Sequence, residues 1–186
     1  VSAILTAFAT ITGALALGVA FAAGDIIENF VAGIFILKDK PFTVGDYIEW
    51  DGNSGIVRGI DLRTTKLDTF NNEQLTVPNG DLANAAVLNP VANETRRGPF
   101  EFGIDYEADI ELAREIIIDE ADKIEGILAD PAPTAPVTGL ADSAVVLQGR
   151  VWINPKETGA GGVRTTWVEA VKNRFDAEGV GMPYPH

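Results

Sequence analysis

The sequence predicts a membrane-protein fragment: one kinked transmembrane helix, then a small β-barrel domain, then an α+β domain. Three observations support this fold class. The first 24 residues carry no charge. After Pro41 the pattern changes to short alternating strands separated by turn residues. The last part alternates strand patterns with amphipathic helices. The expected domains are residues 1–37, 38–98 and 99–186.

The composition argues against most enzyme classes. The chain has 186 residues with 27 Asp and Glu against 14 Lys and Arg, so its formal net charge is -13. This balance repels polyphosphate, and we expect no nucleic-acid partner. The chain has no Cys, and its only His is the last residue, which disfavours thiolate and imidazole chemistry. We therefore expect no catalytic residue, no cofactor and no metal site.

The charged residues also suggest the source and extent of the chain. There are 14 Asp but only 6 Lys. An acid-rich surface with few lysines is typical of adaptation to high salt, where ions screen the self-repulsion, so we hypothesise a halophilic archaeon. The chain begins with Val1 rather than Met, and we expect it to be a fragment of a longer protein.

The uncharged first segment is long enough to cross a membrane. As a helix, 24 residues rise about 36 Å, more than the roughly 30 Å of a bilayer hydrocarbon core. Fifteen of these 24 residues are Ala, Gly, Ser or Thr. A helix facing lipid all round would contain more Leu and Ile, whereas small residues allow close approach of neighbouring helices.

The faces of this helix predict a ring of copies around a pore. Small residues form two ridges on opposite flanks, one with Ala9, Gly13, Ala16 and Ala20, the other with Ala7, Ala14, Gly18 and Ala22. Such ridges suit a copy of the same helix on each side. The face between the ridges carries Leu17 and Phe21, which would form two stacked apolar rings that block ions by dewetting.

Three other interpretations of this segment stay open. A signal peptide is suggested by Ala20-Phe21-Ala22, although no basic segment precedes it and the apolar part is too long. A buried helix of a soluble protein also carries small-residue ridges. A single membrane span without a pore is the third.

A change of direction is expected near Gly24. Glycine is a poor helix former, and Asp25 with Glu28 three residues later resembles an N-cap and capping box. We therefore expect a kink and a second, amphipathic helix to about Leu37 along the membrane interface. Lys38 and Lys40 follow, which indicates a cytoplasmic exit.

The middle segment predicts a small β-barrel or sandwich. A strand at 47–50 is followed by a turn at 51–55 and a further strand from Ile56. Strands at 62–70 and 74–77 flank Asn71-Asn72, and a turn at Pro78-Asn79-Gly80 closes the segment.

The last segment predicts a split βαβ sandwich with β-α-β-β-α order. The expected elements are a strand at 100–104, a helix at 107–128, a strand at 145–153 and a loop at 159–162. A final helix is expected to be capped by Thr166 with Glu169. A last short strand is expected at 182–185.

Other functions have weaker support. Asp105 and Asp109 have the residue types of an acid–base pair, but a solvated acidic face explains them better. Arg58, Arg63 and Lys66 are candidate contacts for RNA or lipid headgroups. A surface charge near a membrane explains them better, and the net charge argues against RNA.

The chain resembles the small-conductance mechanosensitive channels of the MscS type along its whole length. The resemblance is carried by the small-residue helix with Leu17 and Phe21 and by an ordered set of motifs. They are Asn29 and Gly33, Pro41-Phe42-Thr43-Val44-Gly45-Asp46, Gly55-Ile56-Val57, Leu62-Arg63-Thr64-Thr65, Val77-Pro78-Asn79-Gly80 and Pro183-Tyr184-Pro185. The chain differs from the family's usual pattern at Phe21 and Asp25.

The resemblance implies a homoheptamer in the cell membrane, multi-pass in the full-length protein, with cytoplasmic C-terminal domains. The first helix would line the pore, and an Sm-like β-domain and a ferredoxin-like α/β domain would form a vestibule ending in a barrel of C-terminal strands. Membrane tension transmitted by lipids would open it to ions and small solutes on hypoosmotic shock. Leu17 and Phe21 carry over as the gate, Gly24 and Asp25 as the hinge. The sliding helix contacts would be Gly13, Ala14, Gly18 and Ala20.

A second hypothesis uses the same domains differently. The chain would be a membrane-anchored oligomeric scaffold or binding protein without conduction. Substitution of Leu17 by serine would then leave ion flux unchanged.

Overall fold

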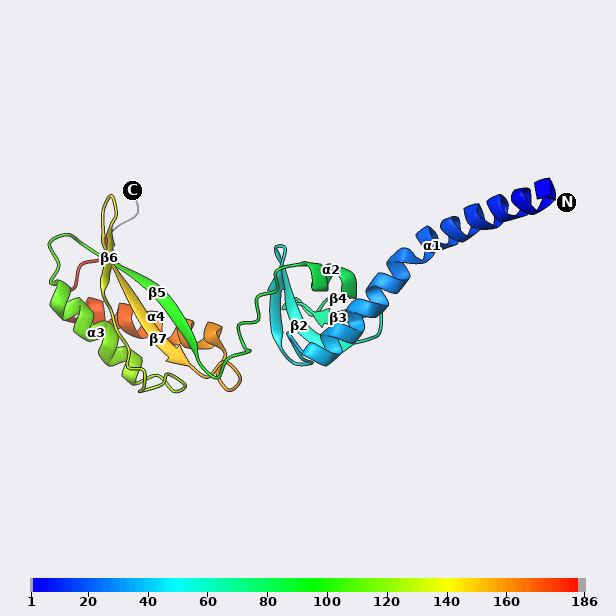
Figure 1. Cartoon of the computed structure of the whole chain (residues 1–186). Helices are drawn as coiled ribbons and strands as arrows, with labels where there is room; N and C mark the ends of the chain where they lie inside the picture. Colours follow the sequence, from blue (N-terminus) through cyan, green and yellow to red (C-terminus); the bar gives the residue numbers. More distant parts are fainter. Residues whose placement is uncertain (1, 184–186) are drawn as a thin grey trace. The chain divides into compact units, whose positions relative to one another are not determined.

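The chain folds into two compact units, Val1–Ala92 and Asn93–His186. The computed structural model describes residues 2–183. Its elements are labelled in Figure 1. The first unit contains α1, β1 to β4 and α2, and the second contains β5, α3, β6, β7 and α4.

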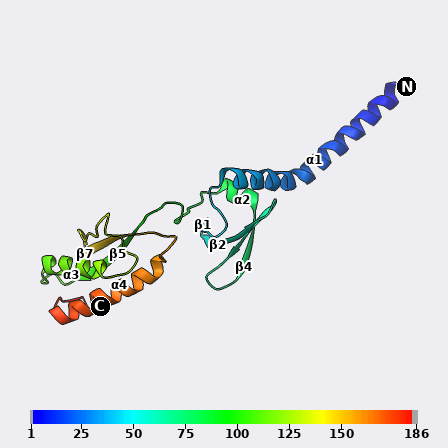
Figure 2. The ribbon, with the colours of Figure 1, turned by 90° about the horizontal axis from the view of Figure 1, so that it is seen from below.

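Helix α1 is a single unbroken helix, Ser2–Asp39. The expectation that a second helix begins at Asp25 is therefore wrong. A glycine inside a helix costs only about 1 kcal/mol, and no proline interrupts the hydrogen bonds of the segment. Figure 2 shows that the axis of α1 nevertheless changes direction along its length. A hinge at Gly24 stays a prediction.

The sheet of the first unit is an antiparallel meander in the order β1-β2-β3-β4. Its strands are β1 Tyr47–Trp50, β2 Asn53–Ile60, β3 Thr64–Asp68 and β4 Gln74–Pro78. The turn before β2 is shorter than expected, because Asp51 (φ 43°) and Gly52 (φ 78°) are both left-handed and reverse the chain in two residues.

A short helix replaces the turn expected at 78–80. Helix α2, Asn79–Asn84, begins directly after Pro78. Asp81 lies in its first turn, where a negative charge is favourable. The helix presents its first residues to α1.

The core of the first unit includes the end of α1. Ile36 of α1 is buried with residues from the sheet, α2 and the loop after α1: Phe42, Ile48, Trp50, Val57, Leu67, Val77 and Leu82. Burial of these side chains holds the last part of α1 on the β-domain.

The second unit has the expected β-α-β-β-α order, formed by β5 Arg96–Ile104, α3 Ile110–Asp122, β6 Val137–Leu140, β7 Val145–Ile153 and α4 Ala160–Glu178. The sheet order is β5-β7-β6, and β7 is antiparallel to both neighbours. β5 and β6 are thus parallel and separated by β7, which confirms the split βαβ arrangement.

Several boundaries in this unit differ from expectation. Helix α3 is shorter at both ends. It starts where the Asp109 carboxylate accepts hydrogen bonds from the N–H groups of Glu111 (2.9 Å) and Leu112 (3.1 Å). Asp109 is therefore a capping residue rather than half of an acid–base pair. Strand β6 is the second strand that the β-α-β-β-α order requires between the helices, although the sequence pattern gave no residue range for it.

Helix α4 begins earlier than expected. Gly161 and Gly162 belong to its first turn instead of a loop, and Thr166 lies inside it. The Thr166 hydroxyl donates to the Gly162 carbonyl (3.1 Å) within the helix, so Thr166 is not the N-cap that was expected. Of the strand expected at 182–185, residues 184 and 185 lie outside the described residues, and 182 and 183 are not strand.

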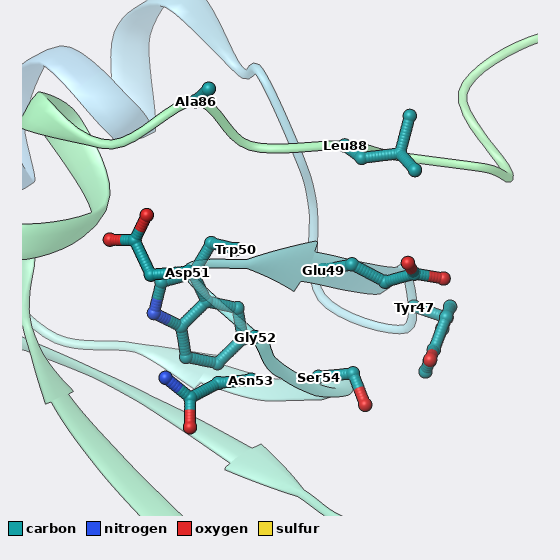
Figure 3. Close-up of a pocket in the computed structure, with 9 residues that line it drawn as sticks. All are labelled: Tyr47, Glu49, Trp50, Asp51, Gly52, Asn53, Ser54, Ala86 and Leu88. Atoms are coloured by element: carbon teal, nitrogen blue, oxygen red, sulfur yellow. The ribbon is translucent and has the colours of Figure 1, made fainter.

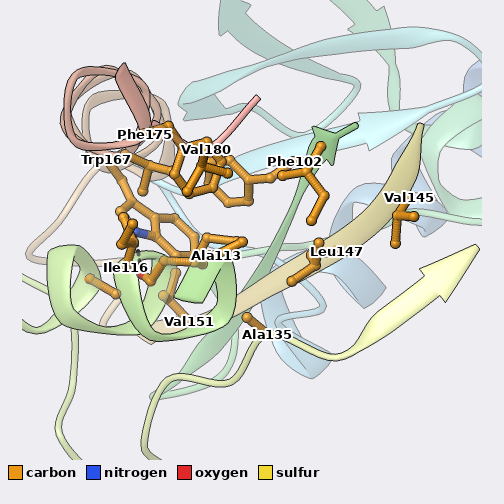
Figure 4. Close-up of a cluster of buried hydrophobic side chains, with 14 residues drawn as sticks. Phe102, Ala113, Ile116, Ala135, Val145, Leu147, Val151, Trp167, Phe175 and Val180 are labelled. Carbon is orange, nitrogen blue, oxygen red and sulfur yellow. Dashed lines mark hydrogen bonds between the residues drawn. The ribbon is translucent and has the colours of Figure 1, made fainter. Parts of the chain in front are cut away.

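The core of the second unit is organised around Trp167, which is fully buried. Its Nε1–H donates to the Ile117 carbonyl of α3 (3.0 Å). Phe100 and Phe102 meet its ring edge-on, with centroids 5.3 and 5.2 Å away. Figure 4 shows Trp167 beside Ile116 within this cluster. One side chain thus joins α4, α3 and the sheet.

An ion-pair cluster adds to the contact between α3 and α4. Arg174 of α4 bonds Asp119 and Glu120 of α3, each at 3.1 Å, and Glu178 at 2.7 Å. The Lys123 ammonium lies 2.6 Å from Glu120. The hydrogen bond from Lys123, followed by that from Arg174, lowers the pKa of Glu120 below its usual 4.5.

This cluster predicts an acid-sensitive step in stability. The unfolded chain binds a proton at Glu120 more readily than the folded chain, so the contribution is present above about pH 4.5 and is lost as the pH falls further. Below that pH, we expect the melting temperature of Glu120→Gln to fall less steeply than that of the unsubstituted protein. Glu115→Gln, on the exposed side of α3, is the control. Parallel melting curves for Glu120→Gln and the unsubstituted protein would contradict the prediction.

Candidate pore helix and its junction with the β-domain

Most of α1 makes no contact with the rest of the described chain. Leu17 is 62% exposed and Phe21 is 82% exposed. A Cβ atom added to Gly13, Gly18 or Gly24 would meet nothing within 4 Å. Ala14 and Ala20 are also exposed. The fold of one chain therefore leaves both ridges and the face between them free.

Among residues 2–183, α1 is the one helix long and apolar enough to cross a membrane. None of the apolar window in it is buried within the chain, which does not support the interpretation as the core helix of a soluble protein. Leu17 and Phe21 are four residues apart on this continuous helix, so they lie one above the other on the same face.

The last part of α1 is held by polar contacts to α2. The N–H of Gly80 donates to the Asn29 side-chain oxygen (2.8 Å), and the Asn29 side-chain nitrogen donates to the carbonyl of Asp25 (2.7 Å). One turn of α1 is thereby bonded to the start of α2. The Asn84 side chain donates to a Glu28 carboxylate oxygen (3.0 Å) and forms a second link.

A buried polar pair fixes the surface on which α1 rests. The Thr65 hydroxyl donates to the Asn79 side-chain oxygen (2.8 Å), and both residues are 0% exposed. The Asn79 side-chain nitrogen donates to the carbonyl of Asp61 (2.9 Å). Leaving either group unpaired would cost about 1–3 kcal/mol, so the start of α2 and the loop after β2 keep one arrangement.

Gly33 brings α1 into direct contact with this surface. A Cβ atom at Gly33 would lie 2.2 Å from the Leu62 carbonyl oxygen and 2.5 Å from the Asn79 side-chain nitrogen. Only glycine fits this approach. Ala32 and Ile36, on either side of Gly33, are buried.

Sequence reasoning found these residues but not what they do. Asn29 and Gly33 entered only as motifs of a resemblance, and Asn79 and Gly80 as such motifs and as part of a predicted turn. A polar residue and a glycine four residues apart on a helix, followed far along the chain by Asn-Gly, are the signals that were present. Gly80 follows Asn29 by 51 residues, and no local pattern shows that they meet.

The rest of the first unit offers little for chemistry. A pocket of about 370 Å³ lies between β1 and the segment from Ala86 to Leu88. Figure 3 shows that the carboxylates of Glu49 and Asp51 do not converge in it. Within residues 2–183, no three His, Cys, Asp or Glu side chains are grouped to hold a metal ion.

The candidate RNA contacts are largely engaged within the β-domain. Arg58 pairs with Asp68 and Lys66 pairs with Asp61, both at 2.9 Å. These pairs neutralise two of the three basic residues, which favours the interpretation as ordinary surface charge.

Comparisons with known proteins agree with this architecture. The family "Mechanosensitive ion channel, beta-domain" matches residues 25–92, and "Mechanosensitive ion channel MscS, C-terminal" matches residues 99–182. The small-conductance mechanosensitive channel of Helicobacter pylori is 30% identical over 179 residues, which cover 96% of this chain and 65% of that protein. An uncharacterized MscS family protein of Archaeoglobus fulgidus is 30% identical over 89% of this chain.

A solved structure is similar over almost the whole chain. The crystal structure of Helicobacter pylori MscS in the closed state has a TM-score of 0.88 and 29% identity, covering 97% of this chain and 71% of that one. The chain spans 58% of the length of the Archaeoglobus relative. A long N-terminal helix, a β-domain and an α/β C-terminal domain occur here in the order found in MscS. The chain therefore belongs to the MscS family of mechanosensitive ion channels, which is not a family of enzymes.

Proposed function

We propose that this chain is a subunit of an ion channel that membrane tension opens to release ions and small solutes on hypoosmotic shock. The observation that carries the proposal is the form of α1. It combines a membrane-length, uncharged and unburied first part with a last part fixed in the core of the β-domain. Membership in the MscS family supports the same function.

In the proposed channel, several copies of α1 surround the pore. Leu17 and Phe21 form two apolar rings, where water is expelled and ions are blocked. The helix contacts between copies are formed by Gly13, Ala14, Gly18 and Ala20. Their small side chains let adjacent helices slide at close range. Seven copies are proposed from the resemblance to the family.

The junction with the β-domain defines where α1 is free to move. From Glu28 onward the helix is bonded to α2 and buries Ala32, Gly33 and Ile36, whereas its earlier part has no partner within the described chain. A tilt of the earlier part is therefore absorbed between these regions, where Gly24 has the lowest helix propensity. We assign Gly24 and Asp25 to this hinge.

The proposed setting is the cell membrane, with lipids as partners and with further transmembrane helices in the full-length protein. The β-domain and the α/β domain would form the cytoplasmic vestibule, in the Sm-like and ferredoxin-like arrangement of the family. A source in a halophilic archaeon stays a hypothesis that rests on the acid-rich composition.

Leu17→Ser tests both the function and the gate. Opening of the pore exposes the apolar Leu17 side chain to water, which costs about 1.5–3 kcal/mol per subunit. A serine at this position removes that cost of opening. We expect patch-clamp recording of the full-length protein in liposomes to show stepwise currents under suction, and the same currents at lower tension in Leu17→Ser.

Leu15→Ser is the matched control, because Leu15 lies two residues, and thus about 200°, around the helix from Leu17. We expect its tension threshold to stay near that of the unsubstituted protein. Equal thresholds for Leu17→Ser and Leu15→Ser would place the gate elsewhere. No current at any tension short of rupture would favour the scaffold or binding protein without conduction.

A further inference from the structure

Asp25 is an isolated charge on α1, at the end of its uncharged segment. It is the first charged residue of the sequence and follows 24 uncharged residues. It lies four residues after Phe21, so the two side chains are one turn apart on nearly the same face. Asp25 is exposed. Within residues 2–183, its carboxylate forms no ion pair and accepts no side-chain hydrogen bond; only its backbone carbonyl is engaged, by Asn29.

No base within residues 2–183 forms an ion pair with this charge. The next acid, Glu28, accepts a hydrogen bond from Asn84 of α2 and is thus turned toward the β-domain. The first base on α1 is Lys38, thirteen residues later. That spacing corresponds to about 20 Å along the helix, roughly two Debye lengths at physiological ionic strength.

We propose that Asp25 determines the ion preference of the pore and makes it favour cations. The inference rests on the proposed function, because it requires copies of α1 around a common axis. Each copy then adds one carboxylate to a ring directly beyond the Phe21 constriction. Rings of acidic side chains raise the local concentration of cations and lower that of anions.

The position of Asp25 sets it apart from the acids of the second unit. There, Asp119 and Glu120 pair with Arg174, and Glu111 pairs with Arg114. Within residues 2–183 Asp25 has no such partner, and it lies about one helical turn from Phe21. Coulomb interaction falls with distance and is screened by salt, so the unpaired charge nearest the constriction acts most strongly on a permeating ion.

The test is the reversal potential of the tension-activated current in asymmetric KCl, measured on the full-length protein in liposomes. We expect the unsubstituted channel to reverse toward the potassium equilibrium potential. Asp25→Asn, which keeps the size of the side chain, should lower the K⁺ to Cl⁻ permeability ratio by roughly 2- to 10-fold. Asp25→Lys should shift the reversal potential further, toward that of chloride.

Glu28→Gln is the matched control, since it removes a charge one turn away but keeps an oxygen that accepts from Asn84. We expect its reversal potential to equal that of the unsubstituted channel. Tension-activated currents with the same reversal potential in Asp25→Asn, Asp25→Lys and the unsubstituted protein would overturn the role of Asp25 and leave the channel function standing. Complete absence of tension-activated current in the unsubstituted protein would overturn both.

Discussion

Replacing Gly33 with alanine is expected to disrupt the junction between α1 and the β-domain. The added methyl group would lie 2.2 Å from the Leu62 carbonyl oxygen, which belongs to the backbone and cannot rotate away. Relief of the clash requires α1 to move off the loop after β2 and off Asn79. Overpacking of this kind typically costs about 1–3 kcal/mol, and we expect a value near the upper end.

Two measurements check this result. The thermal unfolding midpoint of the detergent-solubilised protein should fall, and the amide of Gly80 should exchange its hydrogen faster because its bond to Asn29 is weakened. Gly162→Ala is the control, since a methyl group there meets nothing within 4 Å and alanine favours the helix. An unchanged midpoint and unchanged exchange at Gly80 in Gly33→Ala would show that α1 does not rest on this surface.

Replacing Trp167 with alanine is expected to have the largest effect on the second unit. Trp167 is 0% exposed, packs edge-on against Phe100 and Phe102, and donates to the Ile117 carbonyl. Truncation of a buried tryptophan costs about 3–5 kcal/mol. We expect the denaturation midpoint of this unit to fall sharply, together with loss of the near-ultraviolet circular dichroism of its aromatic cluster.

The neighbouring residue supplies the control. Val168 is 39% exposed, so Val168→Ala should cost less than about 1 kcal/mol. Trp167→Phe keeps most of the apolar contact but removes the donor to Ile117, and we expect an intermediate loss. Equal stability of Trp167→Ala and Val168→Ala would refute the central role of this side chain.

Much of the fold was predictable because its signals are local. The strand at Val145–Ile153 alternates between buried and half-buried positions along its whole length, and its boundaries match the prediction. The order β-α-β-β-α follows from the periods of successive segments. The uncharged start of α1 likewise needs no tertiary context, because its length and composition alone suit a membrane.

Two of the incorrect predictions concern glycine or capping residues whose role depends on packing. Gly161 and Gly162 favour a loop by propensity, yet they lie in α4, where burial of Val163 and Trp167 outweighs the cost. Asp25 has the pattern of an N-cap, but the helix continues through it to bury Ala32 and Ile36 on the β-domain. Local propensities of about 1 kcal/mol are smaller than the burial of such side chains.

The candidate site divides in the same way. By itself, the sequence determined the membrane-length helix and the shared face of Leu17 and Phe21, because helical periodicity fixes which residues align. Only the tertiary structure decided that Asn29 bonds Gly80 and that Gly33 lies against Leu62 and Asn79. These contacts join segments about 30 to 50 residues apart, and the hydrogen bonds and close approach that define them exist only after the β-domain has folded against α1.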